Sequence, residues 1–216
     1  MKKLILISVA FAFVATLTIT VQSCKKDTTT TAAAHPTLYD TLGAVALGTM
    51  TPAGVGTAAV GAGSTMVADP VHTGSMIQAG QLVIRDVVDS ALFIIAGDNA
   101  INSYFTVLIE DITDSGGVSS TGFTNLQTNL TNFFSVGTGA PTTGSLAITY
   151  SGKSMQNAHN PSTNYRISHV VTAAAFTQFT NDVVAAAAQN GVPSSSPIVA
   201  SLGAIIGSLQ SSVVNQ

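Results

Sequence analysis

Apolar residues recur at every third or fourth position in four long segments of this chain, with polar residues between them. These segments are 81–96, 124–134, 170–189 and 198–213. Such a spacing places the apolar side chains on one side of a helix, so each segment is predicted to be an amphipathic helix. Two shorter segments, 35–43 and 153–159, also fit helices. The pattern therefore predicts a mostly helical, all-α chain.

A different pattern fills residues 44–80. Gly, Ala, Thr, Ser and Met dominate this stretch, and its apolar residues follow neither the helical nor the strand period. Long connections of this kind are uncommon in compact domains. The sequence thus predicts a long Gly/Ala/Thr-rich insertion after the first helix. A short apolar turn is expected at 101–105, and residues 111–122 are expected to form a polar connection between helices.

The first residues have the pattern of an export signal. Lys2 and Lys3 precede an apolar run at 4–21, and Cys24 follows shortly after it. A positive start, a short apolar run and a small residue before the cysteine fit a cleaved signal peptide better than a stop-transfer helix. An uncleaved membrane anchor with an unmodified cysteine is the alternative.

The residues around Cys24 add a resemblance. The sequence Val-Gln-Ser-Cys that ends there resembles the lipobox of bacterial lipoproteins. This resemblance implies that Cys24 becomes the lipidated first residue of an exported chain, anchored to the cell envelope at the outer membrane, on its periplasmic or its surface side. The domain organisation is then a signal peptide at 1–23, a tether at 24–34 and a domain at 35–216 that contains the insertion at 44–80.

Composition excludes several classes of function. Only 8% of the residues are charged, and seven Lys and Arg with a net charge of −3 cannot neutralise a row of phosphates, so nucleic acid is not an expected partner. The single cysteine excludes an internal disulfide, a four-cysteine zinc site and covalent attachment of a c-type haem. No motif of a hydrolase or a phosphate-binding loop is present. Of the four histidines, His159 lies one helical turn after Met155, and on this spacing alone a structural role is more common than a ligand role.

Several segments resemble the truncated haemoglobins, most closely group 1. The most specific is 150–159 (YSGKSMQNAH), which is similar to the family pattern Tyr-x-Gly-Arg-x-Met-x-x-x-His. The other matching segments are 37–43 (TLYDTLG), 87–89 (VVD), 98–105 (DNAINSYF), 132–134 (NFF), 139–141 (GAP) and 191–193 (GVP). The resemblance covers 37–43 and about 81–216, and residues 44–80 have no counterpart in it. It implies a truncated globin-like helical sandwich with a long insertion.

The resemblance also implies a non-covalently bound haem b whose iron is ligated by His159. Met155 would pack beside the porphyrin, and Phe105 would stack on it from the other side. Lys153, at the family's Arg position, and Arg166 would face the haem propionates. Plain solvation is the alternative for both of these cations. Phe176, which matches the family's penultimate helix, is a candidate for the haem wall or for the core.

The side of the haem opposite His159 departs from the family. Leu92 stands where these globins usually have a Tyr, and Leu126 and Leu130 stand where a Gln is common. The prediction is a pocket without a hydrogen-bond donor, which takes NO or CO readily and holds oxygen poorly. A shift of one residue in the alignment would place Gln127 there as a donor, and His72 in the insertion is a candidate sixth iron ligand.

The expected function is therefore that of a haem-binding protein which reversibly binds a diatomic gas, oxygen or NO, at the cell envelope. Its expected partners are haem, the gas and a membrane reached through the lipid anchor. Two alternatives stay open: a surface lipoprotein that scavenges haem, and a haemless structural lipoprotein on a decayed globin scaffold. Whether the chain is an enzyme, such as an NO dioxygenase or a peroxidase, the sequence leaves undecided.

Overall fold

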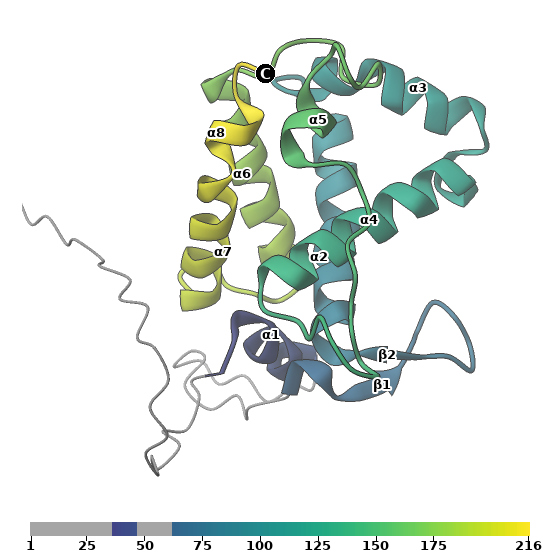
Figure 1. The fold of residues 1–216 in the computed structure, drawn as a ribbon, viewed down its shortest axis with the longest axis vertical. Helices are drawn as coiled ribbons and strands as arrows, with labels where there is room; N and C mark the ends of the chain where they lie inside the picture. The colour runs from purple at the N-terminus through teal and green to yellow at the C-terminus, as the bar shows by residue number, and fades with distance from the viewer. Residues whose placement is uncertain (1–35, 47–61) are drawn as a thin grey trace, which may run out of the picture. The chain divides into compact units, whose positions relative to one another are not determined.

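Helices make up most of the described part of the chain (Figure 1). The computed structural model describes residues 36–46 and 62–216. The helices are α1 (Leu38–Ala46), α2 (Ala79–Gly97), α3 (Thr106–Asp114), α4 (Thr121–Gly137), α5 (Met155–His159), α6 (Ala173–Gln189), α7 (Pro197–Ser208) and α8 (Gln210–Val213). The predicted all-α class is confirmed at this level. The signal peptide, Cys24 and the tether lie outside the described residues.

The remaining regular elements are short. Strands β1 (Met66–Ala68) and β2 (Met76–Gln78) pair in an antiparallel hairpin, and single 3-10 turns span Ala62–Ser64, Asn102–Phe105 and Gly117–Ser119. Within the two described ranges, no helix is long and apolar enough to cross a membrane.

Side-chain caps begin four of the helices. The hydroxyls of Ser120, Ser154, Thr172 and Ser196 accept hydrogen bonds from the backbone N–H groups of the first turns of α4, α5, α6 and α7. Each bond satisfies a backbone donor that has no partner inside the helix. Pro197 follows its cap at the first helical position, where the missing N–H costs nothing.

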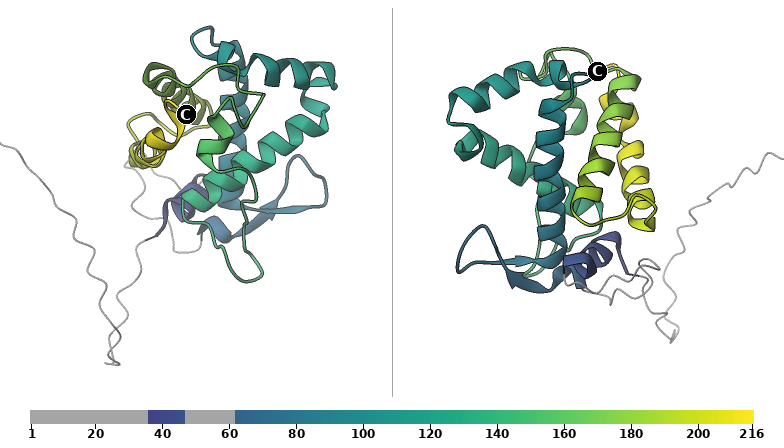
Figure 2. Two further views of the ribbon diagram at one scale, coloured as in Figure 1. Left: turned by 45° about the horizontal axis from the view of Figure 1, so that its top comes forward. Right: turned by 180° about the vertical axis from the view of Figure 1, so that it is seen from behind.

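Helix α2 runs through the middle of the fold (Figure 2). Its apolar stripe, including Val83, Val87, Ala91 and Ile95, is buried. Helices α6 and α7 pack on one side of α2, and α4 crosses it on the other (Figure 1). The period of the apolar residues in 81–96 thus predicted the helix and its buried stripe.

Three glycines allow α1 to lie directly on the chain that follows it. A Cβ atom on Gly43 would collide with the backbone of Gly63, and a Cβ on Gly63 would collide with the carbonyl of Tyr39. A Cβ on Gly80 would meet the Tyr39 ring at 2.8 Å. The Tyr39 side chain is fully buried in this contact, and its hydroxyl donates to Gln78 Oε1 over 3.2 Å.

The hairpin lies in the segment that was expected to be an irregular insertion. Each strand is three residues long, which is too short for an alternating pattern to stand out. The Asp69 carboxylate accepts hydrogen bonds from the backbone N–H groups of Val71 and His72 and so closes the turn. Residues 44–46 belong to α1, and 47–61 lie outside the described residues.

Two further differences concern helices. Residues 106–114 form α3, where the pattern indicated that a polar connection begins at 111. None of the residues of α3 is buried, so its apolar residues do not form the continuous stripe by which a core helix is recognised. The last predicted helix is divided into α7 and α8, since Leu209 ends the first and precedes the second.

Threonine hydroxyls on the outer sides of the helices bond to the helices themselves. Thr113, Thr177 and Thr180 each donate to the carbonyl of the residue four positions earlier, over 2.8 to 3.0 Å. Such a bond satisfies the hydroxyl without any partner from another element. The polar surface is thus built largely from groups that carry no charge.

Candidate functional site

His159 is the last residue of α5, and its ring is held by a backbone group of the same helix. Nδ1 lies 2.9 Å from the carbonyl oxygen of Met155. A carbonyl only accepts hydrogen bonds, so Nδ1 carries the proton and the lone pair is on Nε2. Burial lowers the pKa of His159, which favours the neutral ring. The geometry therefore presents a neutral imidazole whose Nε2 is free to bind a metal.

The loop after α5 stabilises this helix of five residues. Asn164 Nδ2 donates to the Ala158 carbonyl over 2.7 Å, and the Thr163 hydroxyl donates to the Asn157 carbonyl over 3.0 Å. Helices this short are not stable alone, so the loop fixes the conformation that aims His159. Asn and Thr are typical of segments that satisfy backbone groups in this way, and this composition is the only sequence signal of their role.

The segments before and after α5 are attached to two different helices. Before α5, the Tyr150 ring packs edge-on against Phe133 of α4, with 5.2 Å between the ring centroids. After α5, Arg166 Nε donates to Asp111 Oδ2 of α3 over 2.9 Å. The segments on the two sides of α5 are thereby attached to α4 and α3, and α5 itself packs against α8.

The apolar side chains of α3 and α4 are only half covered by the rest of the chain. Helix α3 buries no residue, and α4 buries only Thr131 and Ser135. The half-buried apolar residues of these helices are Val107, Leu108, Ile109, Ile112, Phe123, Leu126, Leu130, Phe133, Phe134 and Val136. The segments before and after α5 are attached to these two helices, so a large flat apolar ligand bound beside His159 would gain contact with their incompletely covered apolar sides.

The residues expected around a haem occupy different positions. Met155 and Phe105 are half-buried and pack against the hydrophobic core. Phe176 is buried and packs against Phe179, so it belongs to the hydrophobic core, which was one of the two roles expected for it. Lys153 Nζ donates to the Thr163 carbonyl over 2.9 Å.

Arg166, the second cation expected at the propionates, is half-exposed and paired with Asp111. Its side chain also lies over the Tyr165 ring, 5.6 Å from the centroid. Lys153 and Arg166 thus each have a partner within the chain, and their role toward propionates stays a prediction.

The leucines expected opposite His159 divide into two groups. Leu92 and Leu130 line a cavity of about 60 Å³, together with apolar residues of α1, α2, α4, α6 and α7, and His159 is not part of this lining. Thr138 is the only polar residue of its lining. Leu126 is half-buried and lies outside this lining.

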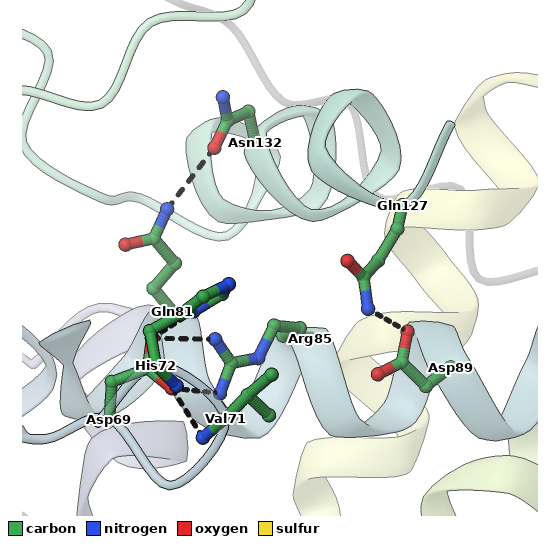
Figure 3. A network of polar contacts seen from close by, with 8 residues as sticks. All are labelled: Asp69, Val71, His72, Gln81, Arg85, Asp89, Gln127 and Asn132. Carbon is green, nitrogen blue, oxygen red and sulfur yellow. Dashed lines mark hydrogen bonds and ion pairs between the residues drawn. The ribbon is translucent and has the colours of Figure 1, made fainter. Parts of the chain in front are cut away.

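The two polar alternatives for that side are bound to other groups (Figure 3). Gln127 Nε2 donates to Asp89 Oδ1 of α2 over 2.6 Å. His72 Nδ1 lies 2.9 Å from Asp69 Oδ2, on the hairpin that precedes the N-terminus of α2. The hydrogen bond between Gln127 and Asp89 was not predicted, because the two residues are 38 positions apart and no local sequence pattern indicates such a contact.

Comparison with known proteins adds no further assignment. No family model matches the chain, and no curated protein sequence matches it significantly. In the part of the chain that the structure describes, no group of three His, Cys, Asp or Glu side chains is placed to hold a metal ion. A haem iron needs only one ligand from the protein, because the porphyrin supplies four.

Proposed function

We propose that this protein binds a non-covalent haem b through His159 Nε2. The observation that carries the proposal is the 2.9 Å contact between His159 Nδ1 and the Met155 carbonyl. Metal-ligating histidines usually donate the other ring N–H to a carbonyl or a carboxylate, which fixes the tautomer and the ring plane. Such a bond at His159 prepares the ring for ligation before any ligand arrives.

The surroundings of α5 support the same proposal. The half-buried apolar residues of α3 and α4 offer area to a porphyrin, and Met155 and Phe105 add to it from α5 and from the turn before α3. Covering such surface with an apolar ligand is favourable by about 25 cal/mol per Å². Haem would thus complete the burial of side chains that the chain leaves half-exposed.

The function that follows is reversible binding of a diatomic gas, such as oxygen or NO, at the cell envelope. A haem with one protein ligand supplies an open iron position at which such a gas can bind. The chain would hold the haem by His159 and surround the gas with Leu92 and Leu130, which offer no hydrogen-bond donor. Cys24, as a lipidated residue, would keep the protein at the membrane.

Reconstitution with haemin tests the proposal. We expect the purified wild-type protein to give a Soret band and a low-temperature electron paramagnetic resonance spectrum typical of histidine-ligated ferric haem. His159→Gly should lose this signature, and free imidazole should restore it by occupying the vacated space. His169→Ala is the matched control, because His169 is exposed and its ring packs in a T-shaped arrangement with the Tyr104 ring, away from α5 in the sequence. Identical spectra for the wild type and His159→Gly would contradict the assignment.

One observation favours haem scavenging as a second candidate. Helix α3 buries none of its residues, so separating it from the site exposes little additional apolar area. A site with such a wall releases its ligand more readily than a fully enclosed one. Transfer of haem to apomyoglobin within minutes would favour scavenging, whereas retention over hours would favour gas binding.

A further inference from the structure

The end of the molecule that carries the hairpin exposes large apolar side chains. Met66 is 42% exposed, Met76 is 56% exposed and Val71 at the turn is 63% exposed. Met66 and Ala68 lie on the same face of β1, and Met76 pairs directly with Ala68, so the two methionines share one face of the hairpin.

A neighbouring loop extends this face. Gln78 Nε2 donates to the carbonyl of Leu146 over 2.9 Å, and Leu146 is itself 39% exposed. We define the hairpin patch as Met66, Ala68, Val71, Met76 and Leu146. Exposed apolar residues that gather at one site mark a surface that contacts another body, whereas scattered ones are ordinary.

The elements around the hairpin patch expose almost no charge. Residues 36–46, 62–80 and 141–150 contain Asp40, Asp69 and His72 as their only charged or imidazole side chains. Asp40 and Asp69 are buried. Arg85 compensates Asp69 through two hydrogen bonds of 2.9 Å (Figure 3). His72 is therefore the one exposed titratable group in these ranges besides the tyrosines.

The opposite end of α2 has a different character. Helix α3 follows that end and carries Glu110, Asp111 and Asp114 at its surface, and the hairpin lies at the other end of α2 in both views (Figures 1 and 2). A helix of 19 residues is about 28 Å long, so the acidic and the apolar regions are well separated. A membrane surface with negative potential repels the acidic region of α3 and accepts the apolar hairpin patch.

We propose that the hairpin patch inserts its apolar side chains into the lipid bilayer to which Cys24 is anchored. The inference rests on the lipid anchor of the proposed function. The chain from Cys24 to the start of α1 is short enough for this, because 13 extended residues span at most about 45 Å. Helix α1, at the start of the described chain, packs against the 3-10 turn that leads into β1 and so lies close to the hairpin. A lipid surface fits a patch that is apolar and free of exposed carboxylates.

Fluorescence quenching by lipid tests the proposal, because the chain contains no Trp. We would prepare the full lipidated apoprotein with Met76→Trp and reconstitute it into phosphatidylcholine vesicles with brominated acyl chains. The matched control is Phe93→Trp, which replaces a side chain of similar exposure, 62%, about 20 Å along α2 from the hairpin. We expect the indole introduced by Met76→Trp to emit at shorter wavelength in vesicles than in detergent-free buffer. It should be quenched at least about threefold more strongly than the indole introduced by Phe93→Trp. Equal quenching of the two reporters would overturn the proposal.

Two further measurements separate the possible causes of failure. Flotation with the vesicles reports the lipid anchor alone: a protein that does not float overturns the anchor and this inference together, whereas flotation with equal quenching overturns only the inference. Adding Met66→Ser and Val71→Ser to the Met76→Trp chain should reduce its quenching by about half or more. The indole of Met76→Trp could also be shielded from water without being quenched by the lipid. If the particle mass were doubled at the same time, this would show a contact between two copies of the chain and overturn insertion. If circular dichroism shows that Met76→Trp does not fold, Val71→Trp serves as the reporter.

Discussion

Gln127 donates its amide N–H to Asp89 over 2.6 Å and so joins α4 to α2 (Figure 3). A carboxylate is a stronger acceptor than a neutral group, so this bond holds the amide in place. In the proposed haem site, the side opposite His159 is thereby left to Leu92 and Leu130. The same bond decides how the protein should respond to substitutions there.

We expect oxygen to dissociate quickly from the reduced, haem-loaded protein, and Gln127→Ala to change this rate by less than about twofold. The amide is bound to Asp89 and does not reach the gas. Leu130→Gln is the matched variant, since it places a donor among apolar residues and should slow dissociation by about tenfold, equivalent to about 1.4 kcal/mol. Stopped-flow displacement by CO measures the rate. Slow dissociation in the wild type that Gln127→Ala accelerates would contradict this arrangement.

The ion pair between Arg85 and Asp69 should be important for stability. Both side chains are more than nine-tenths buried, and removing one leaves the other charge buried and uncompensated. We expect Arg85→Met to lower the free energy of unfolding by about 3 kcal/mol, measured by urea denaturation. Arg85→Met combined with Asp69→Asn should recover part of this loss. Additive effects of the two substitutions would show that the residues are not coupled.

The same pair predicts how stability depends on acid. The Arg85 guanidinium holds the pKa of Asp69 well below its usual range. Because the unfolded chain binds this proton more readily, the contribution is fully present above the ordinary Asp value of 3.8 and is lost as pH falls below it. We expect the unfolding free energy to decline below about pH 4 in the wild type, and to decline less in the double variant. Urea titrations at successive pH values check this.

Asp182 should have the opposite effect to Asp69 on the pH dependence of stability. Its Oδ2 is buried without a hydrogen-bond partner, and burial together with the nearby Asp98 raises the pKa of Asp182. The folded chain holds this proton more tightly than the unfolded chain, so stability falls as pH rises from 3.8 through the raised pKa. We expect Asp182→Asn to stabilise the protein at pH 7 by about 1 kcal/mol and to have a smaller effect at pH 4. Thermal unfolding at the two pH values distinguishes this from a general packing effect, which would not vary with pH.

The contact between α1 and the following turn requires Gly43. A Cβ there would collide with the Gly63 backbone, which has no flexible end that could move aside. We expect Gly43→Ala to destabilise the protein by about 2 kcal/mol or more. Gly203→Ala in α7 is the control, because a Cβ at that position meets no atom within 4 Å and Ala favours a helix by about 1 kcal/mol. A similar change in melting temperature for both variants would contradict the close approach.

Long apolar stripes allowed the helices to be predicted, but contacts between distant segments could not be predicted. The stripe in 81–96 indicated α2 within two residues of its observed bounds, and the stripe in 198–213 began one residue after the start of α7. The hairpin was missed because its strands offer too few residues for a period, and its closure depends on Arg85, a side chain from the next helix. Tertiary contacts of this kind override local composition.

Prediction of the candidate site from the sequence was limited in the same way. The spacing of Met155 and His159 places them on one side of a helix, and this could be read from the sequence. The bond that orients His159, however, is accepted by a backbone carbonyl, so the residue type at 155 does not encode it. The partner of Gln127 could not be predicted either, because the crossing of α2 and α4 determines it.

The threonine hydroxyls that bond to their own helices have a consequence for encounters with other proteins. A hydroxyl that already donates its proton within its own helix can act toward another protein only as an acceptor. A partner that docks on these helix faces therefore finds few free donors. Its polar contacts depend on the charged groups that remain exposed, such as Glu110 and Asp114 of α3. Polar recognition of these faces thus rests on few side chains.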